Sequence, residues 1–140
     1  MARSDVLKEK RSTVEQMAQQ GKLLVDAYAR ILNVYAQRPK LWNPSQMQET
    51  ARLLDQAIAF LVGHVKGKRF ARVRQALRAA RASFHSARKR MHGPAKLEDG
   101  TPRRVIVQVQ LLMGQAQFAT AWFLFHKALD ELGKKKKANR

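Results

Sequence analysis

The chain has 140 residues and carries 28 Lys and Arg against 10 Asp and Glu, a formal net charge of +18. Its length is that of one domain, and a hydrophobic share of 45 % excludes wholesale disorder. The absence of cysteine excludes disulfides and thiolate metal sites, and it is typical of a reducing cytoplasm. The N-terminal segment has no apolar stretch that would predict a secretory signal.

The first predicted helix covers residues 4–37, and it ends before Pro39 because the residue ahead of a proline avoids the α region. A connector with two prolines follows, and Asn43 or Ser45 is expected to cap the second helix, which covers residues 45–65. Spacings near 3, 4 and 7 predict the inner stripe of the first helix as Met17, Leu24, Tyr28, Ile31 and Tyr35.

The second helix and a third helix over residues 68–92 both carry apolar residues at alternating spacings of three and four, the pattern of a buried seam. Gly93 and Pro94 end the third helix. The second helix is expected to bury Met47, Ala51, Leu54, Ile58, Leu61 and Val65. The third helix is expected to bury Phe70, Val73, Leu77, Ala80, Phe84, Ala87 and Met91.

The fourth predicted helix begins after Thr101, a good N-cap with Pro102 at the first helical position, and runs to about Leu132, where Gly133 ends it. An all-α, antiparallel four-helix bundle is therefore predicted for residues 1–133. A basic, disordered tail is predicted for residues 134–140.

The fourth helix is apolar on nearly every side, with no formal charge in the 22 residues from Val105 to His126. A membrane span of this length is weighed and set aside, because the segment holds four glutamines and basic residues flank both ends. A bundle core needs about a third of a helix surface, so the surplus predicts a second interface, in a homo-oligomer or with a tight partner. One seam consists of Val105, Val109, Leu112, Ala116, Ala119 and Phe123, and the oligomer interface is assigned to Ile106, Met113, Phe118, Trp122 and Phe125.

Basic residues concentrate between His64 and Arg104, where thirteen Lys and Arg face two acids, a net +11 in 41 residues. Such self-repulsion favours a polyanion partner, and nucleic acid binds by releasing counterions from its phosphates. The alternative is a solvated surface that serves solubility alone. The predicted nucleic-acid-binding residues are Arg69, Arg72, Arg74, Arg78, Arg81, Arg88, Lys89, Arg90, Arg103, Arg104, Lys134, Lys135, Lys136 and Lys137. Charge alone does not distinguish RNA, an RNA–DNA hybrid and DNA as the partner.

Catalytic chemistry finds little support in the sequence. The four histidines are not spaced as metal ligands, no nucleophile motif surrounds a serine, and no Gly-rich phosphate loop or zinc-finger spacing is present. We therefore expect a protein that is not an enzyme and that uses no metal or cofactor.

The string LLDQAIAFLV, from Leu53 to Val62, resembles the second helix of the accessory variability determinant family, Avd, the small basic partner of the reverse transcriptase in diversity-generating retroelements. The start of the fourth helix is also similar, with Thr101 and Pro102, then Val105 and Trp122 seventeen residues apart. The resemblance covers roughly residues 20–137. The chain departs from Avd in its long polar N-terminal segment and in a longer junction between the second and third helices.

This resemblance implies a bundle that assembles into a barrel-like homopentamer and binds both the reverse transcriptase and its template RNA. Such a protein is bacterial or phage-encoded, cytoplasmic and not itself the polymerase, and it supports mutagenic cDNA synthesis at template adenines. The bacterial ribosomal intervening-sequence proteins share the bundle, but their Asn-Ile-Ala-Glu-Gly signature is absent here.

Two other readings of the same residues remain open. A small helical subunit of another nucleoprotein complex, such as a CRISPR effector, would also be a basic bundle, but would be monomeric alone. A membrane-surface protein could use the fourth helix together with the lysines at residues 134–137. We expect nucleic acid rather than a membrane as the partner.

Overall fold

Four helices make up the computed structural model, which describes the backbone of residues 2–138 and the side chains of residues 13–132. Helices α1 (Ala2–Gln37) and α4 (Arg103–Ala138) have 36 residues each. Helices α2 (Pro44–His64) and α3 (Ala71–Arg90) are shorter, with 21 and 20 residues. The described residues contain no strand, so the predicted all-α fold with four helices is confirmed.

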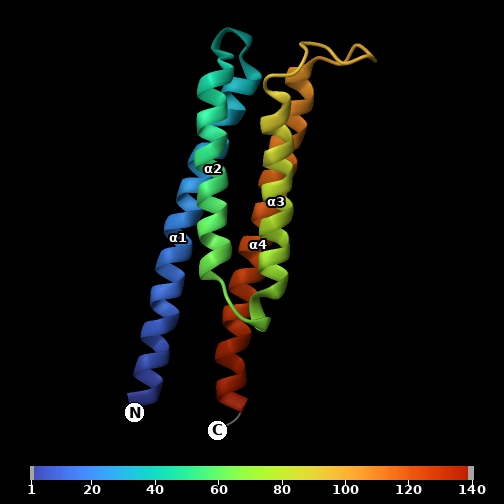
Figure 1. Ribbon diagram of the computed structural model, residues 1–140. Coiled ribbons are helices and arrows are strands. Elements are labelled where there is room, and N and C mark those ends of the chain that lie inside the picture. The colour runs from blue at the N-terminus through green and yellow to red at the C-terminus, as the bar shows by residue number, and fades with distance from the viewer. Residues whose placement is uncertain (1, 139–140) are drawn as a thin grey trace.

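The helices follow one another around the bundle. Among the described residues α1 packs on α2, α2 on α3, α3 on α4 and α4 on α1, while no Cα atoms of the diagonal pairs come within 8 Å of each other. The pairs α1–α2 and α3–α4 are the most extensive, so the fold consists of two helical hairpins packed together (Figure 1). The α2–α3 side of the bundle therefore lies opposite its α1–α4 side. Figure 1 also shows α1 and α4 extending beyond the α2–α3 connection, at the end that holds both termini.

Two short 3₁₀ helices shape the connections. Element η1 (Pro39–Leu41) joins α1 to α2, and η2 (Lys68–Phe70) leads into α3. Asn43 caps α2, since its Oδ1 accepts the backbone N–H of Gln46 at 3.2 Å. Gly67 precedes η2 at φ +99°, a conformation that glycine adopts without steric cost.

A glycine lies at the closest approach inside each hairpin. A Cβ built on Gly21 of α1 would lie 2.7 Å from Cγ of Leu61 on α2, and one on Gly114 of α4 would lie 2.6 Å from Cε1 of Phe84 on α3. In each pair the absence of a glycine side chain lets a large residue of the neighbouring helix pack directly against the glycine backbone. These glycines therefore set the spacing of the two hairpins.

The core seams of α2 and α3 are the predicted ones. Every residue expected to be buried on α2 is buried, and the same holds on α3 except that Phe70 is half-buried against the core. The α1 stripe is wrong by one position, since Leu24 and Ile31 are 47 % and 42 % exposed. Large residues misled the prediction, because α1 packs closely on α2 through small ones. The α1 core residues are Ala18, Val25, Ala29, Leu32 and Ala36.

The structure places the two apolar sets of α4 differently from the sequence assignment. The seam from Val105 to Phe123, which is not part of the predicted oligomer interface, is exposed, with Leu112 at 60 % and Phe123 at 67 %. Two residues assigned to an oligomer interface, Phe118 and Phe125, lie in the core, and Trp122 packs against it. Ile106 is half-buried, and only Met113 of that set is exposed, at 50 %. The core positions of α4 are Val107, Leu111, Gly114, Phe118, Ala121, Phe125, Ala128 and Leu129.

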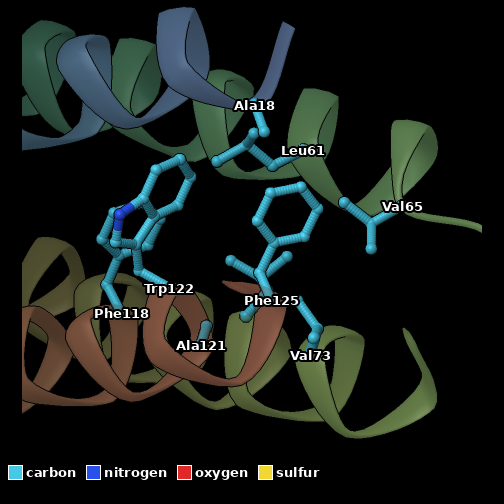
Figure 2. A pocket seen from close by; sticks show the side chains of 9 residues that line it. Ala18, Leu61, Val65, Val73, Phe118, Ala121, Trp122 and Phe125 are labelled. Carbon is cyan, nitrogen blue, oxygen red and sulfur yellow. The ribbon is translucent and has the colours of Figure 1, made fainter. Parts of the chain in front are cut away.

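Figure 2 shows this part of the core, where Trp122 and Phe125 of α4 point toward Ala18 of α1 and Leu61 of α2. The rings of Trp122 and Phe125 stack with centroids 5.5 Å apart. The gap between these side chains is only about 10 Å³, and its lining is almost wholly apolar, so it is a packing defect and no ligand site.

The C-terminal end of α4 also differs from the prediction. The backbone remains helical through Gly133 as far as Ala138, so the predicted helix end at Gly133 is wrong. A helical glycine costs only about 1 kcal/mol relative to alanine, and lysine propagates helices well. The side chains of the predicted binding lysines at residues 134–137 lie outside the described residues.

Candidate nucleic-acid interface

Helix α3 carries seven Lys and Arg and no acid over its 20 residues, and it forms the centre of the candidate interface. Its buried seam faces the bundle, which leaves the basic positions at the flanks and on the outer side. The exposed basic side chains of η2 and α3 are Lys68, Arg69, Arg72, Arg78, Arg81, Lys89 and Arg90.

Three of the predicted phosphate-binding arginines hold α3 against α2. Arg74, Arg81 and Arg88 recur every seven residues and therefore lie on one flank of α3. Arg74 donates from Nη1 to the carbonyls of Val65 at 3.0 Å and Gly67 at 2.7 Å, just beyond the end of α2. The contact with the C-cap residue Val65 satisfies a carbonyl at the helix end, whereas the Gly67 carbonyl also accepts the backbone N–H of Phe70.

Arg81 forms a two-pronged ion pair with Asp55 of α2, at 2.6 Å from Nε and 3.1 Å from Nη2. The hydrogen bonds to this carboxylate raise the pKa of Arg81. Arg88 donates from Nε to Oε1 of Gln48 at 3.2 Å, and Gln48 donates back to the Arg88 carbonyl at 2.9 Å. The sequence analysis missed these α2 partners because they lie 26 and 40 residues away along the chain.

The outer positions of α3 carry basic side chains without such partners. Arg78, His85 and Lys89 are exposed, and no hydrogen bond or ion pair engages them among the described residues. Helical periodicity places the three on one stripe, and Arg78 to Lys89 span about 16 Å along the helix. Arg81 lies beside this stripe and keeps 47 % of its side chain exposed while paired.

Glu49 on α2 partly neutralises the positive charge of this surface. Glu49 accepts hydrogen bonds from Arg52 one turn later, and this contact holds the pKa of Glu49 below its ordinary value. The exposed surface of α2 and α3 thus combines the stripe of Arg78, His85 and Lys89 with two internally paired charges. We call this surface, made by Arg52, Arg78, Arg81, His85 and Lys89, the basic face.

Arg103 and Arg104 lie elsewhere, where α4 begins near the loop after α3. Arg103 donates from Nη1 to the carbonyl of Gly93 at 2.6 Å, and its guanidinium lies 4.8 Å from the ring centroid of Trp42. Arg103 is therefore a structural contact like Arg74. Arg104 is half-buried and has no hydrogen-bond partner among the described residues.

On the opposite side of the bundle α4 presents a second seam. Its members repeat at spacings of four and three, just as the core seam does, and all are exposed. The two seams are offset by two residues, which places them on nearly opposite sides of the helix. Together with exposed Leu23 and Val34 of α1, we call this surface the apolar face; its α4 members are Val105, Val109, Leu112, Met113, Ala116, Ala119 and Phe123.

Neither a metal-binding group nor a membrane-spanning helix is present among the described residues. No three His, Asp or Glu side chains come together as a metal-binding group within the part of the chain that the structure describes. Over the same residues, no helix is both long and apolar enough to cross a bilayer.

Comparison with known proteins gives no family for the chain. No protein-family model, no curated protein and no solved structure matches it.

Proposed function

We propose that this protein is a non-catalytic, nucleic-acid-binding accessory protein, and that RNA bound at the basic face is its principal partner. The segregation of charge from apolar area carries this proposal: α3 has no acid, whereas the described outer seam of α4 has no charge. Charge that served only solubility would have no reason to be absent from the outer seam of α4. Arginine suits the role because its planar fork makes paired contacts with phosphate.

We propose further that the apolar face packs against other copies of this chain to form a closed homo-oligomer. An exposed apolar surface of this extent on a monomer commonly marks an interface. Its four–three spacing fits a helix of the same kind in a knobs-into-holes contact. Because the two faces are opposite, such an assembly keeps the strongly basic faces apart and directed outward, which limits the repulsion between copies.

The specific role that we propose is that of the Avd-like partner of a retroelement reverse transcriptase, supporting mutagenic cDNA synthesis on a template RNA in a bacterial or phage setting. The resemblance of residues 53–62 and of the start of α4 supports it, and so does the combination of a basic face with an apolar one. In this role the protein positions RNA and polymerase without performing chemistry.

The second candidate is a small helical subunit of another nucleoprotein complex, such as a CRISPR effector. The observation that favours it is that Phe118 and Phe125 lie in the core of a single chain. A chain that buries these two rings without a partner can be stable as a monomer. In that case a different protein covers the apolar face.

RNA binding over a range of salt concentrations tests the basic face. The variant Arg78→Gln with Lys89→Gln should bind a structured RNA more weakly and reduce the slope of log K against log salt by about two. Filter binding or anisotropy measures this, with circular dichroism to confirm the fold. The matched control, Arg30→Gln with Lys127→Gln, removes the same charge from exposed positions on α1 and α4 and should keep a steeper slope. Equal slopes for both variants would contradict the proposed face.

A cDNA-synthesis assay tests the specific role. Addition of the protein to a retroelement reverse transcriptase and its template RNA should raise cDNA yield and the frequency of changes at template adenines. The double variant of the basic face should lose most of this stimulation. Unchanged synthesis by a polymerase that does not bind the protein would favour the second candidate.

A further inference from the structure

A pocket of about 270 Å³ is lined by residues of the α1–α2 connection, the α3–α4 loop and the start of α4. Figure 1 shows these connections at the end of the bundle away from the termini. The pocket volume is just below the range of ~300–1,000 Å³ that ligand pockets occupy. The lining residues are Pro39, Trp42, Ala95, Pro102, Arg103 and Arg104.

The pocket walls are held in place before any ligand arrives. The backbone N–H of Arg103 donates to the Ala95 carbonyl at 2.8 Å, and the Leu97 N–H donates to the Thr101 carbonyl at 2.9 Å. An isolated β-bridge joins Lys96 to Pro102. The loop is therefore pinned to the first turn of α4, which makes the site largely preformed.

The pocket combines flat, stackable groups with an unengaged cation. The Arg103 guanidinium lies over the Trp42 indole and is fixed by its bond to Gly93, so the two form a rigid stack. Arg104 has no hydrogen bond or ion pair among the described residues and is the cation that remains to bind an anion. No acid lines the pocket, and the positive end of the α4 dipole lies beside it.

A second observation marks the same place. The indole Nε1 of Trp42 is buried and has no hydrogen-bond partner among the described residues. Such a donor normally finds an acceptor when it is buried. Trp42 also packs against the core, so its ring is held in place beside the pocket.

We propose that this pocket binds one unstacked nucleotide of a single strand, with the base against the Trp42–Arg103 stack and a phosphate at Arg104. The inference rests on the proposed function, because it names the part of the nucleic acid that this site takes. Aromatic rings and arginine planes are the usual platforms for splayed bases, whereas duplex bases are enclosed in their own stack. The pocket is separate from both the basic face and the apolar face.

Tryptophan fluorescence tests the proposal directly, since the chain has only two Trp. In Trp122→Phe, Trp42 is the only tryptophan, and titration with AMP or CMP should quench it saturably, while inorganic phosphate should not. Arg104→Gln in that background should weaken the nucleotide affinity about tenfold, the loss of one charge-assisted hydrogen bond. Lys40→Gln removes a neighbouring exposed charge that does not line the pocket and should leave the affinity within twofold. Isothermal titration of the wild-type chain repeats the measurement if Trp122→Phe folds poorly.

A short single-stranded RNA with a fluorescent label separates this inference from the proposed function. Binding of the strand with quenching of Trp42, and displacement of AMP, supports both. Strand binding that leaves Trp42 unquenched and is equal in Arg104→Gln overturns the pocket proposal and leaves the basic face standing. Binding of AMP that the strand does not displace means that the site takes a free nucleotide, which overturns its assignment to a strand. Absence of saturable quenching by mononucleotide and strand alike overturns the pocket proposal altogether.

Discussion

The α2–α3 side and the α1–α4 side of this bundle are built on the same kind of buried seam, yet they differ completely at their outward positions. The outward stripe of α3 carries Arg78, His85 and Lys89, whereas the outward stripe of α4 carries residues such as Leu112 and Phe123. Packing of the buried seams requires neither basic nor apolar residues at these outward positions. This difference is the basis of our proposal that each outer face has its own kind of partner.

The largest effect is expected from introducing charge into the apolar face. Leu112→Glu with Phe123→Glu places two carboxylates where copies of the chain would meet, and burial of unpaired charge should abolish assembly. Light scattering should then give a mass near 16.0 kDa. The control, Gln75→Glu with Ala82→Glu, adds the same charge at exposed positions of α3. It should keep the oligomer and weaken RNA binding, and the comparison fails if both variants lose the same property.

A substitution on the core side of α4 should instead lower the stability of the folded chain. Phe125→Ala, made in the Leu112→Glu and Phe123→Glu background so that assembly makes no contribution, should lower the free energy of unfolding by about 3–5 kcal/mol. Val109→Ala in the same background, at a position that is 51 % exposed, should change it by less than about 0.5 kcal/mol. Urea denaturation measures both, and equal losses would mean that the two seams of α4 are not distinct.

A smaller loss of stability is expected where the two helices of a hairpin approach each other closely. Gly114→Ala places a Cβ against the Phe84 ring, and the overpacking should cost about 1–3 kcal/mol, although alanine favours helix. Gly63→Ala on α2 meets nothing within 4 Å and should raise stability by up to about 1 kcal/mol. Thermal unfolding of the two variants checks the prediction, which is contradicted if Gly114→Ala is also stabilising.

The smallest effect concerns the ion pair within the basic face. Asp55→Asn releases Arg81, and because both side chains are partly exposed, the loss of stability should not exceed about 1 kcal/mol. The released arginine should strengthen RNA binding and increase the salt slope by up to about one. Asp26→Asn, which releases Lys22 on α1, makes the same charge change and should leave RNA binding nearly unchanged. A stronger gain from Asp26→Asn would place the RNA elsewhere.

Much of the fold follows from local sequence patterns. The seams of α2 and α3 could be predicted because each has one apolar stripe with polar residues around it. Helix α4 has two stripes with the same spacing, and local pattern alone does not rank them. The lengths of the two stripes do distinguish them. The outer stripe stops at Phe123, because its next positions are His126 and Asp130, whereas the core stripe continues through Phe125 to Ala128.

The candidate site was predictable only in part. Clustered charge identified α3 as basic, but the positions of Asp55 and Gln48 relative to it depend on how α2 packs on α3. The same limit applies to Arg103, whose partners Trp42 and Gly93 come from two connectors. Charge density is a property of the sequence, while the division of arginines into helix-to-helix contacts and unengaged cations is a property of the tertiary structure.

The most direct test of the division between two faces is the native mass of the nuclease-treated wild-type protein in high salt, measured by light scattering after size exclusion. A closed oligomer, near 80 kDa if it contains five 16.0 kDa chains, is the expected result. A homogeneous 16.0 kDa monomer would contradict self-assembly through the apolar face and would assign that face to a different protein.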